Sequence, residues 1–264
     1  MARHGRDRIS APIAVPGVIA LSLLSLPLLA VALRAPWRSL RALLNQEVIR
    51  QTMALSVVTS LASAMLCLAL GMPLAALLAH GTGRWVPIVR TVATMPIVLP
   101  PVVAGVALLL AFGRNGLVGQ WLWQWFGVQI PFSTAAVVMA QTFVAMPFLI
   151  LTLEGALRHA DADLADAAAT AGATRMQTLW FVTLPAIGPS VFAALMLAWA
   201  RAFGEFGATI TFAGNFPGRT QTLPLSVYLA LQTDPDVAIA LSLVMIVVSL
   251  AVLAGLRERW ISAR

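Results

Sequence analysis

The chain has 264 residues, of which 60% are hydrophobic and 10% are charged, and its formal net charge is +7. A composition this apolar, with a mean hydropathy of +0.89, is typical of a protein whose helices lie in lipid. All 17 basic residues are arginine, and the lack of lysine excludes a phosphate-binding loop of the G-x-x-x-x-G-K-[ST] type and Schiff-base chemistry.

The few cysteines and histidines exclude further kinds of site. Cys67 is the sole cysteine, so the chain has neither an intrachain disulfide nor a C-x-x-C metal pattern. His4, His80 and His159 are far apart in the sequence, and the H-E-x-x-H pattern of an intramembrane protease is missing. The arginines are scattered over short loops, which favours contact with lipid headgroups over a nucleic-acid surface.

Six apolar stretches are long enough to cross a membrane as helices. A chain in lipid must satisfy its backbone hydrogen bonds internally, and long helices do so. The predicted fold class is therefore all-α integral membrane, with six transmembrane helices. The predicted spans are residues 13–33, 53–79, 86–112, 134–153, 186–212 and 237–256.

The arginines predict which way the chain crosses the membrane. With a cytoplasmic N-terminus, ten arginines fall on the cytoplasmic side, six on the outer side and one inside a span. This excess favours cytoplasmic N- and C-termini. The first span has an alternative interpretation, because arginines before an apolar run and Ala30-Val31-Ala32 after it resemble a cleaved secretory signal. Its length of about 21 apolar residues exceeds the usual signal core, so we expect a retained span.

The second and third spans carry residues that shape helices. Small residues recur every three or four positions along one face of the second span, which predicts close packing of a neighbouring helix, with lining of a pathway as the alternative. These residues are Ser56, Ser60, Ser63, Cys67 and Gly71. In the third span, Pro96, Pro100 and Pro101 predict a kink, which either lines a cavity or is a structural bend.

A tryptophan cluster follows the third span. Trp121, Trp123 and Trp125 cannot all share one helical face. Such rings are typical of the headgroup region. We therefore expect a short helix on the outer surface and no seventh span.

The polar segment between the fourth and fifth spans is cytoplasmic in this topology. Asp161 can cap a helix through the alanine-rich run, which Gly172 would end at its C′ position. Thr174 can cap a second short helix, and Pro185 opens the next span. The pattern predicts a helix–Gly–helix element at the membrane surface, or simply a solvated connector.

This segment resembles the EAA motif of the permease subunits of bacterial ABC importers, E-A-A-x3-G-x9-I-x-L-P. The spacing is kept, with Asp in place of the first Glu and Val in place of Ile. The matching residues are Asp166, Ala167, Ala168, Gly172, Val182, Leu184 and Pro185. The resemblance implies a coupling helix that docks in a groove of a separate ATPase subunit.

Two charges lie deep in the fifth span. Arg201 and Glu205 are four residues apart, so they can form a pair along one helical face. Charge at this depth marks a translocation pathway or a purely structural bridge between helices. Gly204 and Gly207 allow close approach of a neighbour or local flexing.

Polar donors follow the fifth span. Pro217-Gly218 predicts a turn, and the residues around it can bind a tetrahedral oxyanion or a protein partner on the outer side. The candidates for this contact are Arg114, Asn215, Arg219, Thr220, Gln221 and Thr222.

The runs GEFGATITFAGN and PGRTQTLPLSVY, and AFGRNGLVG after the third span, are similar to the molybdate branch of these permeases. The sulfate branch is the close alternative. The resemblance implies a type I ABC importer permease fold in residues 47–256, preceded by a segment 1–46 with the first span and followed by a cytoplasmic tail 257–264.

The same resemblance implies a homodimer that works with two ABC ATPase subunits and a periplasmic molybdate-binding protein in the bacterial inner membrane. The chain itself would hold no cofactor and no metal and perform no catalysis, since ATP and Mg would bind the partner ATPase. The choice among molybdate, tungstate and sulfate stays open. A secondary transporter and an intramembrane enzyme are the rival classes; they leave the EAA spacing unexplained or lack paired catalytic groups.

Overall fold

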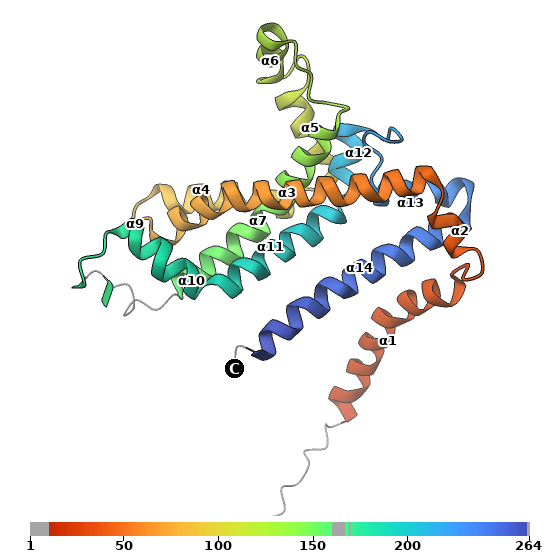
Figure 1. Cartoon of the computed structure of the whole chain (residues 1–264), viewed down its shortest axis with the longest axis horizontal. Helices are drawn as coiled ribbons and strands as arrows, with labels where there is room; N and C mark the ends of the chain where they lie inside the picture. Colours follow the sequence, from red (N-terminus) through yellow and green to blue (C-terminus); the bar gives the residue numbers. More distant parts are fainter. Residues whose placement is uncertain (1–10, 160–166, 169, 263–264) are drawn as a thin grey trace, which may run out of the picture.

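The computed structural model describes residues 11–159, 167–168 and 170–262, and every regular element in these ranges is helical (Figure 1). The elements are α1 (Ala11–Arg34), α2 (Leu40–Leu44), α3 (Glu47–His80), α4 (Trp85–Val98), α5 (Pro101–Phe112), α6 (Gly119–Phe126), α7 (Thr134–Arg158), α9 (Arg175–Thr178), the π-helical turn η1 (Leu179–Thr183), α10 (Leu184–Ala186), α11 (Gly188–Phe203), α12 (Gly207–Ala213), α13 (Leu223–Thr233) and α14 (Pro235–Ser262).

Four single helices are long and apolar enough to cross a membrane: α1, α3, α7 and α14. Two bent pairs bring the number to six, α4 with α5 and α11 with α12, whose members meet at bends of 120° and 59°. The all-helical fold with apolar spans that the sequence predicted is confirmed. Two of the six spans are broken helices and not straight crossings.

The break between α4 and α5 follows from proline chemistry. Leu99 has an extended backbone (φ −65°, ψ 131°), the conformation that a following proline favours because its ring crowds the preceding residue. Pro100 then precedes the new helix at Pro101. Pro96 lies inside α4 without ending it. The predicted kink is therefore placed at Leu99–Pro100.

The core forms where α3, α7 and α11 lie side by side (Figure 1). The small-residue face of α3 is buried along this contact, and a Cβ at Gly71 would stand 2.8 Å from Leu149 Cδ2. Ser63 donates to Gln141 Oε1 at 3.1 Å, and Trp199 Nε1 donates to Ser60 Oγ at 2.9 Å. Close helix packing, the first interpretation of this stripe, is confirmed.

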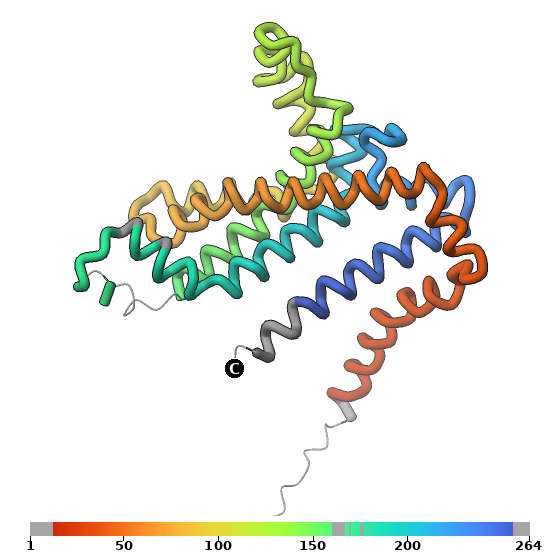
Figure 2. The backbone as a smooth tube through the Cα atoms, in the orientation of Figure 1, coloured from red at the N-terminus to blue at the C-terminus, as the bar shows by residue number. Residues whose placement is uncertain are grey.

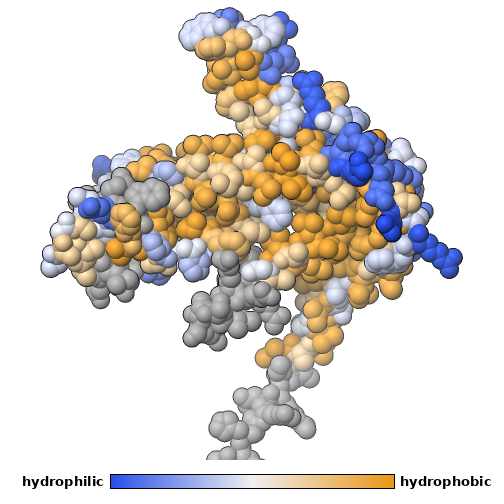
Figure 3. Space-filling model, viewed as in Figure 1, coloured by the Kyte–Doolittle hydropathy of each residue, from blue (hydrophilic) through white to orange (hydrophobic). Residues whose placement is uncertain are grey.

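Polar side chains gather at the ends of the molecule. Figure 3 shows apolar side chains over its middle and hydrophilic ones at the tip that carries α6 and at the left and right ends of the view. The tryptophan cluster forms the short helix α6, as predicted, and Trp121 and Trp125 are exposed there. Helices α5 and α6 project from the bundle beside α12 (Figure 1).

Candidate functional site

The segment with the EAA-like spacing forms the turn that its glycine predicted. Gly172 has φ +86°, in the left-handed region. Ala171 N donates to Ala167 O, and Ala173 N donates to Ala168 O, both at 3.0 Å. The second bond spans the turn as in a Schellman motif with glycine at C′. Apart from its two chain neighbours, no atom of the described residues lies within 4 Å of where a Gly172 Cβ would be, so the requirement for glycine comes from the backbone conformation.

A second cap follows directly. Thr174 Oγ1 accepts from Gln177 N at 3.3 Å, and Gln177 Oε1 accepts from Thr174 N at 2.8 Å. This reciprocal arrangement is a capping box and starts α9. Gly172 and Pro185 are exposed, while Asp166 lies outside the described residues. Figure 2 shows the turn at one end of the molecule, far from α2. The described part of the motif is therefore placed where a partner can reach it.

Arg201 and Glu205 form the predicted ion pair. Arg201 Nη1 lies 2.7 Å from Glu205 Oε2, and the Glu205 side chain is fully buried. The other carboxylate oxygen, Oε1, accepts from Ala208 N at 2.9 Å and so begins α12. Glu205 is thus part of the break between α11 and α12, because its carboxylate binds the last turn of one helix and the first turn of the next.

The two helix breaks pack against each other. A Cβ at Gly207 would stand 2.5 Å from Pro101 Cβ, so only glycine allows this contact. At Gly204 the nearest atom to a Cβ would be Ala200 O at 3.6 Å, an ordinary contact. Arg201, 29% exposed, lines a cavity of about 100 Å³ beside the breaks. Its other lining residues are Pro96, Ile97, Leu99, Pro101, Ala104, Val144 and Phe148.

The polar loop after α12 differs from the expectation. Thr220, Gln221 and Thr222 are buried, so they do not offer donors on the surface of the described chain. The loop turns inward: Thr220 Oγ1 accepts from Phe216 N at 2.9 Å, and the first residue of α13, Leu223, donates its N–H to Ser56 Oγ on α3 at 2.7 Å.

The other three candidates for the outer-side contact are at least partly exposed: Arg219, Asn215 and Arg114. Arg219 is exposed, and Asn215 is half-buried with no hydrogen-bond partner for Oδ1 within the described chain. Arg114 is exposed too, with its guanidinium 4.2 Å from the centre of the Trp123 ring, a cation–π contact. Both arginines are therefore accessible from the surface of the described chain.

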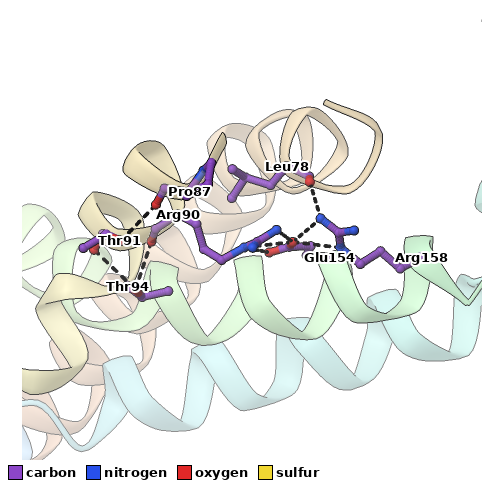
Figure 4. Close-up of polar contacts among 7 residues, drawn as sticks. All are labelled: Leu78, Pro87, Arg90, Thr91, Thr94, Glu154 and Arg158. Carbon is purple, nitrogen blue, oxygen red and sulfur yellow. Dashed lines mark hydrogen bonds and ion pairs between the residues drawn. The ribbon is translucent and has the colours of Figure 1, made fainter. Parts of the chain in front are cut away.

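Sequence reasoning missed a second charged cluster, Arg90, Glu154 and Arg158 (Figure 4). Glu154 is 6% exposed and accepts from Arg90 Nε at 3.1 Å and from Arg158 Nε at 3.0 Å. Arg158 Nη2 also donates to Leu78 O at 2.7 Å, which caps the last turn of α3. The i,i+4 spacing of Glu154 and Arg158 was the available signal, and it is the spacing that identified Arg201 and Glu205.

Comparisons with known proteins identify the family of the chain. Residues 70–264 match the family model described as binding-protein-dependent transport system inner membrane component. The molybdenum transport system permease protein of Mycobacterium bovis is 48% identical over 93% of this chain and 92% of its own length. Its counterpart in Escherichia coli K12 is 36% identical over 80% of this chain and 93% of its own length.

A solved structure shares the fold. The crystal structure of a bacterial ABC transporter involved in the import of the acidic polysaccharide alginate aligns with a TM-score of 0.74 and 16% identity. The alignment covers 94% of this chain and 93% of that chain. At this identity the likeness establishes the arrangement of the helices and does not identify the substrate.

Proposed function

Since the chain belongs to the binding-protein-dependent transport system inner membrane components, we propose that it is the permease subunit of an importer that carries molybdate across the inner membrane. The similarity to named molybdenum permeases over nearly the whole chain carries the choice of substrate. The exposed turn at Gly172 supports an importer whose energy comes from a separate protein, because the turn is a preformed element on which such a protein can dock.

The energy comes from a partner in this proposal. The chain has no lysine for a phosphate-binding loop, so two copies of a separate ABC ATPase would bind ATP and Mg. They would dock on the coupling segment around Ala167, Ala168, Gly172 and Pro185, with Asp166 as its first residue. A homodimer of the permease with cytoplasmic termini would form the pathway, and a periplasmic molybdate-binding protein would deliver the anion.

Arg201 is the residue that we assign to the pathway. Arg201 lines the cavity at the two helix breaks, and its pairing with Glu205 neutralises its charge in part. A partly neutralised arginine attracts a dianion without holding it tightly, as transport requires. Gly204 lies between the two residues of the pair, and Gly207 follows it and allows the contact between the breaks. On the outer side, Arg219, with Arg114 and Asn215, would attract the anion or contact its binding protein.

Uptake into proteoliposomes that contain the permease, the ATPase and the binding protein tests this function. We expect ATP-dependent uptake of labelled molybdate, with strong inhibition by excess tungstate and little by sulfate or phosphate. Equal competition by sulfate would overturn the choice of substrate but keep the permease. Uptake without ATP, driven by an ion gradient, would overturn the ABC importer.

A further inference from the structure

The cluster of Arg90, Glu154 and Arg158 lies apart from the proposed pathway and has no role in it so far. Glu154 and Glu205 are the two buried carboxylates among the side chains whose burial the structure describes. Burying a carboxylate is costly unless charged donors surround it, and Glu154 has donors from two arginines. Helix packing around α7 does not need a buried carboxylate, so the presence of Glu154 and its two arginines indicates a further role.

The cluster joins three helices, at the last turns of α3 and α7 and the middle of α4. Arg90 belongs to α4, Glu154 and Arg158 belong to α7, and the accepting carbonyl of Leu78 belongs to α3. Arg158 is also the last residue of α7, directly before the segment that leads to Gly172. The cluster therefore lies at the end of α7 that leads toward the coupling segment.

The same two helices form walls of the cavity at Arg201. Pro96 and Ile97 of α4 line one part, and Val144 and Phe148 of α7 line another. Arg90 precedes Pro96 by six residues and Glu154 follows Phe148 by six, about 9 Å along each helix at the α-helical rise. The ion pair between Arg90 and Glu154 thus fixes the spacing of α4 and α7 roughly two turns from the cavity.

We propose that Arg90, Glu154 and Arg158 are positioning residues that transmit movement of the coupling segment to the width of the Arg201 cavity. The inference rests on the proposed function. Arg158 passes a displacement of the segment to Glu154, and the guanidinium of Arg90, which meets the carboxylate through both Nε and Nη2, makes α4 follow α7. The position of α4 then determines where the break at Leu99 lies, and Leu99 lines the cavity.

Arg90→Gln and Arg158→Gln test the proposal, because each leaves Glu154 paired with the remaining arginine and strands no charge. The matched control is Arg50→Gln, which removes an arginine from the exposed pair with Glu47 near the opposite end of α3. The measurement is the amount of molybdate imported per ATP hydrolysed in proteoliposomes with the complete importer.

We expect both variants to assemble with the ATPase and hydrolyse ATP, while molybdate per ATP falls about threefold or more, in the range of known coupling effects. The control should keep the wild-type ratio. A merely structural cluster would lower uptake and hydrolysis together, and an unchanged ratio in both variants overturns the proposal. If Arg90→Gln does not insert, Arg90→Lys, which keeps the charge but loses the paired donors, decides in its place.

The wild-type protein separates this inference from the proposed function. No ATP-dependent molybdate uptake by the wild-type complex would refute the function itself. Wild-type uptake with unchanged ratios in the variants would refute the positioning role alone.

Discussion

Glu205 uses its two carboxylate oxygens for two purposes, and they can be separated by mutation. One oxygen pairs with Arg201 and the other accepts from Ala208 N. A glutamine at this position keeps an acceptor for Ala208 N but loses the charge. Glu205→Gln therefore isolates the ion pair from the start of α12.

We expect Glu205→Gln to destabilise the protein because it leaves Arg201 without a counter-charge, and the double variant Arg201→Gln/Glu205→Gln to be more stable than Glu205→Gln alone. The interaction energy should be about 1–3 kcal/mol, as is usual for residues in direct contact. Thermal melts of the four detergent-purified forms measure it. The exposed pair of Glu47 and Arg50 is the control and should give less than about 1 kcal/mol.

The sequence predicts a contact between two side chains well when the two residues are close together along the chain. Arg201 and Glu205 are four residues apart, and their pairing followed from helical spacing. Arg90 and Glu154 are separated by 64 residues, so their contact depends on how α4 meets α7 and has no local signal. Polar residues are usually exposed, which explains why the burial of Thr220 and Thr222 was not predicted; the loop folds inward onto α3.

At the scale of helices, two glycines at one break give a matched comparison. A Cβ at Gly207 would overlap Pro101, whereas a Cβ at Gly204 has room. We expect Gly207→Ala to destabilise the protein by about 1–3 kcal/mol, as overpacking usually does, and Gly204→Ala to have little effect. Melting temperatures of the purified variants measure both. Equal melting temperatures would show that α5 and α12 do not depend on this contact.

The turn at Gly172 provides a second prediction about an element. Its φ of +86° strongly disfavours a β-branched residue, so Gly172→Val should distort the coupling segment and reduce recovery of the ATPase subunit in a pull-down. Gly188→Val is the control, since Gly188 also has open space around it and lacks the positive φ. Normal ATPase recovery and uptake with Gly172→Val would count against the docking role.

The positions of the spans could be predicted, because a long apolar stretch is a strong signal. The two breaks within spans could be predicted only in part. Pro100 marks the end of α4, since the residue before a proline avoids the helical conformation. The break before α12 depends on the Glu205 carboxylate and on the approach of Pro101, and hydropathy reports neither. A continuous fifth span was therefore predicted where the structure has two helices.

At the scale of the whole molecule, positive charge on the predicted outer side should raise the rate at which the anion or its binding protein encounters the permease. We expect Arg219→Ala to slow molybdate uptake and to weaken its dependence on salt, because an exposed charge acts mainly on encounter. Initial uptake rates at several salt concentrations measure this. Arg38→Ala removes the same charge from another exposed position on that side; equal effects of both variants would indicate net charge alone.

Burial of the sole cysteine makes the chain suitable for thiol labelling. Cys67 is completely buried, with Sγ 3.6 Å from Thr142 O, so water-borne maleimides do not reach it in the folded protein. A cysteine introduced at an exposed position would then be the chain's sole reactive thiol. In a dimer of identical copies, one such substitution places two spin labels or fluorophores at equivalent points. Their separation can be followed through the ATP cycle without first removing a native cysteine.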